Sequence, residues 1–207
     1  MTGIPLVGLI FSISIFIIAI AVHELAHGWV AYKFGDPTAK YMGRLTLNPL
    51  AHIDLTGTVI LPILLIIMGS PIIFGWAKPV PINYLGLRHP KRDIIWVGLA
   101  GPLANIIFAF LIVTLSRFLP FAHIGLLQQL FEGAILINLV LAAFNLIPIP
   151  PLDGSRVLFG LLPREYAVEY IKLEKYGFLI ILVLLYLGLV DRLIWPMVLI
   201  LAKLIGI

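Results

Sequence analysis

The chain has 207 residues, of which 61% are hydrophobic and only 12% are charged, and its formal net charge is +4. Soluble domains carry about 25% charged residues, so this composition excludes an ordinary soluble protein. It predicts a single membrane-embedded domain over residues 1–207, in which the positive charge concerns orientation in the bilayer and not nucleic acid. The chain has no cysteine, so a metal site has to use nitrogen and oxygen ligands.

Residues 5–32 form the first apolar stretch and predict a membrane-spanning helix. Near its end stand His23, Glu24 and His27. Two histidines four residues apart share one helix face and can clamp a metal ion, and the glutamate lies close enough to take a proton from a water bound there. Packing or a helix-terminus contact is the alternative for paired histidines. The uncharged flank at residues 4–22 favours function, because ionisable groups are costly at membrane depth.

Four further apolar stretches follow, at residues 58–74, 93–117, 125–146 and, as a pair, 176–190 and 193–207. Residues 58–74 contain two prolines and a glycine, so we expect a re-entrant or broken segment there. The connector Asp191–Arg192 predicts a tight helical hairpin. The expected fold is an all-α polytopic membrane protein with about five to six transmembrane helices.

Proline-rich stretches shape two loops. Residues 75–83 cannot be helical and should be extended, which predicts a short extended or β element near the active site. Residues 145–154 contain three prolines in four positions and present Asp153 from irregular backbone at the end of a membrane helix. Asp153 is equally well explained as a cap of the following helix. His52 is a lone loop histidine and is expected to make surface contacts or hydrogen bonds.

These motifs resemble the site-2 protease family of intramembrane zinc metalloproteases, specifically its small members. The resemblance covers most of the chain and depends on residues 23–27, 75–81, 100–105 and 145–154. It implies one zinc ion held by His23, His27 and Asp153, with Glu24 as the catalytic base. It also implies that Asn145 lies at the active site and that the extended segment near Trp76 pairs with substrate.

Pro79 and Pro81 alternate along this extended segment and leave Val80 between them able to donate a hydrogen bond. We therefore expect unpaired backbone groups around Lys78 and Val80 to add a substrate segment as another strand.

The expected function is intramembrane proteolysis: zinc-activated water attacks a peptide bond within or near a transmembrane segment, with a glutamate as general base. The expected partners are a transmembrane peptide or membrane-protein substrate and the lipid bilayer. A zinc-dependent membrane hydrolase of a non-protein or lipidated substrate is the main alternative. A metal transporter is less favoured, because no internal repeat is visible.

The topology follows from bringing His27 and Asp153 to one depth, which requires that residues 58–74 do not cross the membrane fully. Only Arg117 and Arg192 then lie opposite the other basic residues. The positive-inside rule places the zinc site near the cytoplasmic face of the cell membrane, the N-terminus outside and the C-terminus in the cytoplasm.

Overall fold

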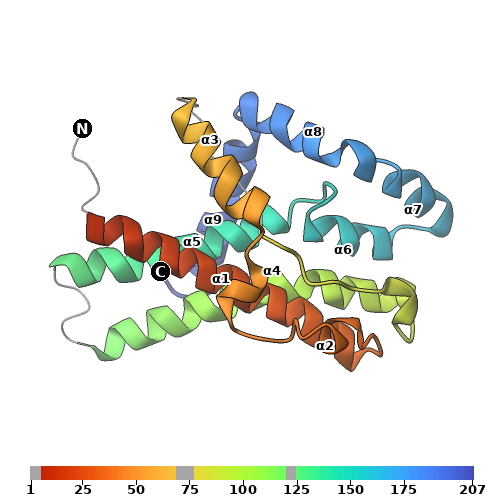
Figure 1. Cartoon of the computed structure of the whole chain (residues 1–207), viewed down its shortest axis with the longest axis horizontal. Coiled ribbons are helices and arrows are strands. Elements are labelled where there is room, and N and C mark those ends of the chain that lie inside the picture. Colours follow the sequence, from red (N-terminus) through yellow and green to blue (C-terminus); the bar gives the residue numbers. More distant parts are fainter. Residues whose placement is uncertain (1–5, 69–76, 120–124) are drawn as a thin grey trace.

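The computed structural model describes residues 6–68, 77–119 and 125–207, and within these ranges it is helical and contains no strand (Figure 1). Three of its helices are long and apolar enough to span a bilayer, namely α1 (Leu6–Lys33), α4 (Pro90–Phe118) and α5 (Gly125–Asn145). The all-α prediction is therefore confirmed. The expected count of five to six spans is not confirmed, because the described residues give three spans, or four if one bent pair counts as a span.

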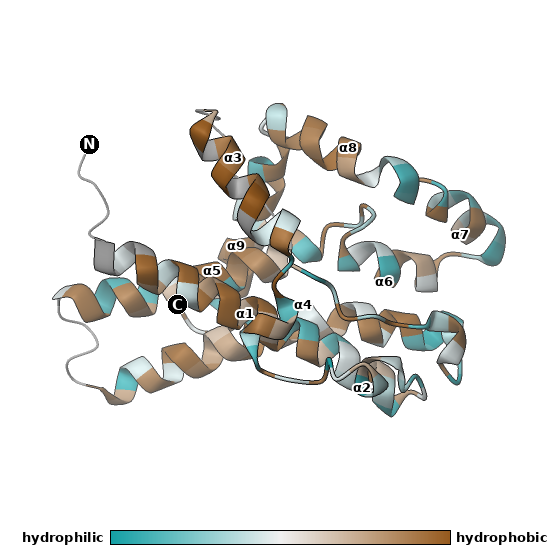
Figure 2. Cartoon of the chain, in the orientation of Figure 1, coloured by the Kyte–Doolittle hydropathy of each residue, from teal (hydrophilic) through white to brown (hydrophobic). Residues whose placement is uncertain are grey.

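Helix α4 is the centre of the fold. It packs against both α1 and α5, and it is the most buried of the three candidate spans. Hydrophobic residues run along the middle of these helices, and hydrophilic ones gather toward their ends (Figure 2). The remaining exposed apolar side chains on α4, such as Ile107, Phe110 and Leu111, fit contact with hydrocarbon, where apolar exposure carries no penalty.

The chain between α1 and α4 leaves and returns at one end of the bundle. It passes through α2 (Thr38–Tyr41), short helical turns at Pro49–His52 and Leu55–Ile60, and α3 (Leu61–Ile67). The Arg88 N–H donates to the Phe34 carbonyl at 2.9 Å, so the start of α4 lies beside the end of α1.

The two ends of the apolar excursion also meet, because the Lys78 N–H donates to the His52 carbonyl at 2.9 Å. Residues 52–78 therefore make no net crossing, as the depth argument requires. Gly69, Pro71 and Trp76 lie outside the described residues. Residues 77–83 have no regular secondary structure, so the predicted β element is not formed in the part of this segment that the structure describes.

After α5 the chain forms α6 (Asp153–Leu161), α7 (Arg164–Ile171), α8 (Glu174–Tyr186) and α9 (Leu189–Leu204). Helices α8 and α9 are bent by 85° at a break that contains Gly188, which has a φ of 64°. The predicted hairpin at Asp191–Arg192 is wrong, since both residues lie inside α9. Only glycine adopts this left-handed backbone at no steric cost, so the break falls at Gly188 and not at the charged pair.

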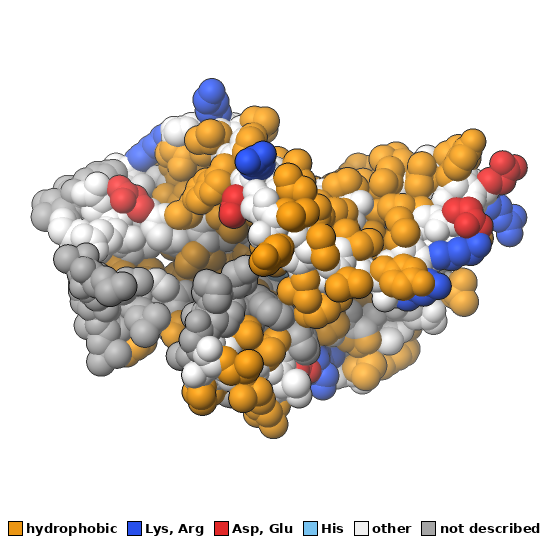
Figure 3. Space-filling model, turned by 90° about the horizontal axis from the view of Figure 1, so that it is seen from above, with side chains coloured by type: hydrophobic (Ala, Val, Ile, Leu, Met, Phe, Trp, Pro, Cys, Tyr) orange, Lys and Arg blue, Asp and Glu red, His pale blue; other side chains and the backbone are white. Residues whose placement is uncertain are grey.

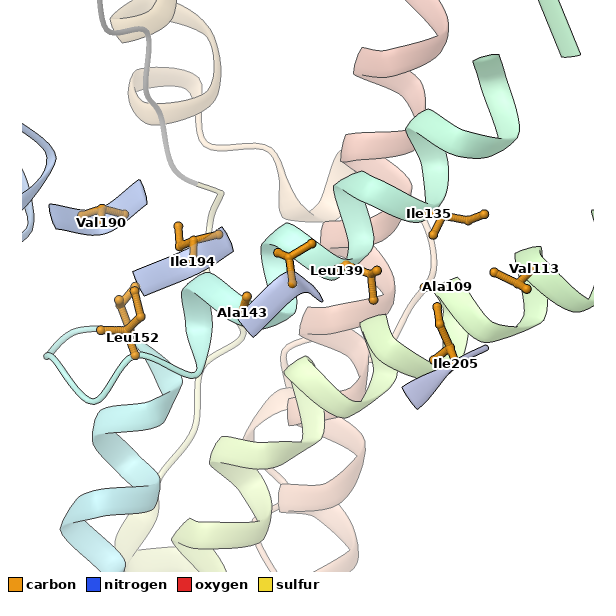
Figure 4. Packing of buried hydrophobic residues seen from close by; sticks show 11 residues of the cluster. Ala109, Val113, Ile135, Leu139, Ala143, Leu152, Val190, Ile194 and Ile205 are labelled. Carbon is orange, nitrogen blue, oxygen red and sulfur yellow. The ribbon is translucent and has the colours of Figure 1, made fainter. Parts of the chain in front are cut away.

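Helix α9 runs along the bundle, and its C-terminal end lies at the end of the bundle away from the histidines. Val190 and Ile194 belong to the same apolar cluster as Leu152, and Ile205 at the other end lies beside Ala109 and Val113 of α4 (Figure 4). Arg117, at the end of α4, donates through Nη2 to the Gly206 carbonyl at 2.7 Å.

The C-terminal residues thus lie at the Arg117 end of α4, whereas the histidines contact α4 between Val97 and Asn105. The expected placement of the C-terminus on the histidine side is wrong, because Gly206 contacts Arg117. Lys203 joins Arg117 at this end, and Arg192 lies toward the Leu152 end of α9.

Hydrophobic side chains form a broad area on the described part of the face seen in Figure 3, and several acidic and basic side chains gather at the end where α7 lies. On α7 the Lys172 Nζ pairs with Glu169 at 2.5 Å. This distribution fits a bundle immersed in lipid with one charged end at the interface.

Gly177 of α8 tests how tightly the C-terminal pair packs. A Cβ at this position would collide with the Pro150 carbonyl, whereas a Cβ at Gly133 of α5 would meet nothing within 4 Å. We expect Gly177→Ala to lower the free energy of unfolding by about 1–3 kcal/mol. The matched Gly133→Ala should be neutral or stabilising by up to about 1 kcal/mol, because alanine favours a helix. Thermal unfolding in one detergent measures both, and equal stabilities would contradict this close packing.

Candidate metal centre

His23 and His27 stand one turn apart on α1 and face α4. Both are buried, with 7% and 5% of their surface exposed. Their Nε2 atoms lie 3.0 Å from each other. The helical spacing thus brings two imidazole nitrogens to one point, as the sequence predicts.

The far side of each ring is engaged by a hydrogen-bond acceptor. The His27 Nδ1–H donates to the Val97 carbonyl at 2.6 Å. The His23 Nδ1–H donates to the Asn105 Oδ1 at 2.6 Å. Asn105 presents its oxygen because its Nδ2 donates to the Ala19 carbonyl at 3.1 Å and to the Asn138 Oδ1 at 2.9 Å. Each Nδ1 therefore carries a proton, and in the neutral form of each ring the lone pair that can bind a metal ion is on Nε2.

Asp153 supplies the third group. Its Oδ2 lies 2.9 Å from the Nε2 of His23 and 3.1 Å from the Nε2 of His27. Asp153 is the first residue of α6, and α6 packs on α4. Close approach at Gly98, whose Cβ would lie 3.0 Å from the Asp153 carbonyl, allows this packing. The carboxylate therefore points at the histidines, as the metal-ligand interpretation of Asp153 requires.

With both rings neutral, three lone-pair acceptors converge at one point. Such an arrangement is repulsive unless a cation or a proton lies between them. Ligands about 2.0–2.1 Å from a tetrahedral zinc lie about 3.3 Å apart, and the observed separations of 2.9–3.1 Å are close to this value. The two imidazoles and one carboxylate therefore fit a catalytic zinc site, which keeps a fourth position open.

Gly101 leaves the space for this site. A Cβ there would collide with the Nε2 of His27 and would also lie 2.5 Å from the His23 ring. Gly101 lies among small residues of α4, which let another helix approach closely, and α1 packs against α4 there.

Glu24 lies between the histidines in sequence and contacts residues 77–83, which we call the strap. Its Oε2 accepts the Val80 N–H at 2.6 Å. The Oε1 atom has no hydrogen-bond partner among the described residues. A Cβ at Gly28 would crowd the Val80 side chain, at 2.9 Å, so glycine lets the strap lie directly on α1.

Several backbone groups of the strap are already hydrogen-bonded to other parts of the chain. Lys78 donates to His52, and the carbonyls of Lys78 and Pro79 accept from the Arg44 Nη2 at 2.8 and 3.3 Å. Since Val80 also donates to Glu24, the expectation that Val80 offers a free donor is wrong for this conformation. The sequence shows that Val80 can donate but not to which acceptor.

Two other predicted residues are not among the three converging groups. Asn145 ends α5, is half-buried and donates through Nδ2 to the Leu141 carbonyl at 3.0 Å. Its Oδ1 accepts no hydrogen bond in the described part of the chain. His52 is buried and its Nε2 contacts the Thr46 carbonyl at 3.0 Å, so it is a hydrogen-bonding residue and does not join the cluster.

Sequence reasoning missed Asn105 and Val97 as partners of the histidines. Asn105 lies in the middle of an apolar helix, where an unpaired amide is costly. Its position in the sequence therefore indicates that its side chain has a hydrogen-bond partner. Val97 acts through its backbone, which leaves no trace in residue type.

Comparison with known proteins agrees with this geometry. The family model described as Peptidase family M50 matches residues 11–125 and 119–188. A relative in Bacillus subtilis (strain 168), with the printed name "Putative zinc metalloprotease YwhC", is 41% identical over 93% of this chain and 88% of its own. In Mycolicibacterium smegmatis, "Putative zinc metalloprotease Rip2" is 32% identical over 88% of this chain and 69% of its own.

"Zinc metalloprotease MJ0392" of Methanocaldococcus jannaschii is 29% identical over 76% of this chain, which spans 35% of that longer relative. No solved structure matches the chain. A family model over most of the sequence and a 41% identical relative, on a fold that brings His23, His27 and Asp153 together, show that the chain belongs to peptidase family M50, the site-2 protease family of zinc metalloproteases.

Proposed function

We propose that this zinc metalloprotease hydrolyses peptide bonds within or near transmembrane segments, with one zinc ion held by His23, His27 and Asp153. The observation that carries the proposal is the convergence of two Nε2 atoms and one carboxylate oxygen within 3.1 Å, at buried positions of a membrane bundle. Bound zinc supplies Lewis acidity, which polarises the scissile carbonyl and lowers the pKa of a water molecule toward neutrality.

Glu24 is proposed as the general base. Its Oε2 is held by the Val80 N–H, which leaves Oε1 to accept a proton from the attacking water. The same carboxyl group can then return the proton to the leaving amine. Water and substrate approach from the Asp153 side, because the Asp153 side chain is 20% exposed whereas those of the two histidines are 8% and 6% exposed.

Substrate contacts are proposed for residues around the strap and for Asn145. A transmembrane helix hides its carbonyls in internal hydrogen bonds, so its scissile segment has to unwind before hydrolysis. The exposed Lys78 and the buried Val80 belong to the strap, and Trp76, outside the described residues, precedes it in sequence. The Oδ1 of Asn145, which has no partner among the described residues, can accept from an unwound backbone.

The proposed orientation places the metal centre near the cytoplasmic face of the cell membrane. Arg117 and the C-terminal residues beside Lys203 lie at one end of the bundle, and most other basic residues belong to the segments next to the start of α4 and to α6 and α7. The positive-inside rule assigns the more basic end to the cytoplasm.

Glu24→Gln tests the proposed reaction. The amide cannot take a proton, so we expect cleavage of a synthetic membrane-spanning peptide to fall by about 100- to 10,000-fold. Zinc content should stay at one ion per chain, because Glu24 is not among the ligands. Product analysis by mass spectrometry and metal analysis of the same sample measure both quantities.

Asp153→Ala is the comparison for that experiment and should lose both zinc and cleavage. Asp191→Ala changes an exposed acid of α9 and should lose neither. An active Glu24→Gln protein, or a fully zinc-loaded Asp153→Ala protein, would contradict the proposed roles.

Asn105→Leu tests the hydrogen bond that orients His23. Leucine keeps the volume but removes the acceptor of the Nδ1 proton, so the ring loses its fixed tautomer. Loss of such a partner costs about 10- to 100-fold in metal affinity. Competition with a chelator measures this, and Thr114→Val on the same helix should leave the affinity unchanged because Thr114 bonds only the Phe110 carbonyl.

Lys78→Glu tests the proposed contact of the strap with substrate. The side chain is exposed, so its replacement should leave zinc content and stability unchanged while shifting the preference between peptides that carry acidic and basic residues beside the cleavage site. The ratio of kcat/KM for such a peptide pair is the measurement. A ratio equal to that of the unmodified protein would remove Lys78 from the substrate-contacting surface.

A further inference from the structure

Arg44 is a buried cation whose contacts the proposed reaction does not use. Only 8% of its surface is exposed, and its Nε is buried without a hydrogen-bond partner among the described residues. Its Nη2 donates to the carbonyls of Lys78 and Pro79. In the described part of the chain it has no ion-pair partner. Burying a cation without a counterion costs several kcal/mol, so the position calls for a compensating role.

The local backbone directs Arg44 toward the strap. Gly43 ends α2 with a φ of 65°, and the Arg44 N–H turns back to the Ala39 carbonyl at 2.8 Å. This is a glycine-terminated helix end, which reverses the chain sharply. The guanidinium thereby meets the two strap carbonyls that immediately precede Val80.

A continuous set of bonds joins Arg44 to the proposed base. Arg44 holds the Lys78 and Pro79 carbonyls, and the next residue, Val80, donates its N–H to the Glu24 Oε2 at 2.6 Å. Because Pro79 and Pro81 stiffen the backbone on both sides of Val80, a shift at the Arg44 contact displaces that N–H as well.

The far end of the strap is anchored separately. The Asn83 N–H donates to the Asp36 Oδ2 at 2.7 Å, and Asp36 is fully buried. With this end fixed, Arg44 controls the part of the strap that touches Glu24.

We infer that Arg44 is a positioning residue for proteolysis, which acts through the strap to hold the Glu24 carboxylate in the orientation needed to accept the water proton. The inference rests on the proposed role of Glu24. Displacement of a reacting group by about 1 Å lowers turnover by about 100-fold without removing the group itself. Arg44 should therefore affect kcat and leave zinc binding unchanged.

Hydrogen exchange of the zinc-free protein tests the structural half of this inference. Pro79 and Pro81 have no N–H, so exchange in residues 78–81 reports only Lys78 and Val80. Arg44→Met should accelerate this exchange at least about tenfold. Lys40→Met removes an exposed cation that bonds the Tyr32 hydroxyl, and it should leave the exchange unchanged. Unchanged exchange in Arg44→Met would overturn the inference.

Steady-state cleavage by the zinc-loaded protein tests the functional half. Arg44→Met should lower kcat by about 10- to 100-fold, with KM, zinc content and melting temperature close to those of Lys40→Met. Arg44→Lys should recover part of the loss, because an ammonium group can donate to one strap carbonyl. A loss of zinc, or a rise in KM with unchanged kcat, would overturn the inference.

A double-variant comparison separates this pathway from a general defect. Replacing Val80 with its α-hydroxy analogue turns the amide N–H into an ester oxygen, which removes the bond to Glu24 and also weakens the Pro79 carbonyl as the longer of the two acceptors of Arg44. If both changes act on one path, combining them should cost no more in kcat than the larger single effect. Multiplicative losses would overturn the inference. Failure of the unmodified protein to cleave, or cleavage by Glu24→Gln, would instead count against the proposed function.

Discussion

The structure depends on satisfying the polar atoms of two imidazoles inside a membrane bundle. Hydrocarbon offers no hydrogen bonds, so each buried donor needs a partner from the chain. Asn105 and the Val97 carbonyl accept the two Nδ1 protons, and Asn105 is itself held by Ala19 and Asn138. These bonds connect α1, α4 and α5 and turn both Nε2 atoms toward Asp153. The contacts that pack the three apolar helices therefore also arrange the ligand atoms.

Helix α4 serves both purposes because of its small residues and its proline. Gly98 and Gly101 let α6 and α1 approach closely enough for Asp153 and the histidines to meet. Pro102 lies inside the helix and lacks an N–H, so it disturbs the turn that precedes it. The carbonyl that loses its helical N–H donor is that of Gly98, four residues earlier, and the neighbouring Val97 carbonyl accepts the His27 Nδ1–H. A regular helix of large residues at these positions would keep α1 too far away for a shared ligand site.

The parts that sequence reasoning predicted share a physical basis. The helical spacing of His23 and His27 and the long apolar stretches of α1, α4 and α5 are local properties, which periodicity and hydropathy report directly. The absence of a net crossing between α1 and α4 followed from a depth constraint. Asn105, Val97 and the Glu24–Val80 bond depend on which distant segments meet, and no local pattern encodes these pairings. The charged pair Asp191–Arg192 predicts a helix break at the wrong position. The break lies at Gly188, because backbone conformation and not side-chain charge decides where the helix ends.

In the strap, the local sequence pattern predicts a backbone donor but not the acceptor that it meets in the fold. Its alternating prolines predict an extended segment with a donor at Val80, and this donor is used to hold the Glu24 carboxylate. A substrate that paired with the same N–H would have to displace the carboxylate. Competition between these two acceptors would release the proposed base whenever substrate bound to that edge. Substrate contact through side chains such as Lys78 avoids this conflict, because it leaves the Arg44, Val80 and Glu24 contacts intact.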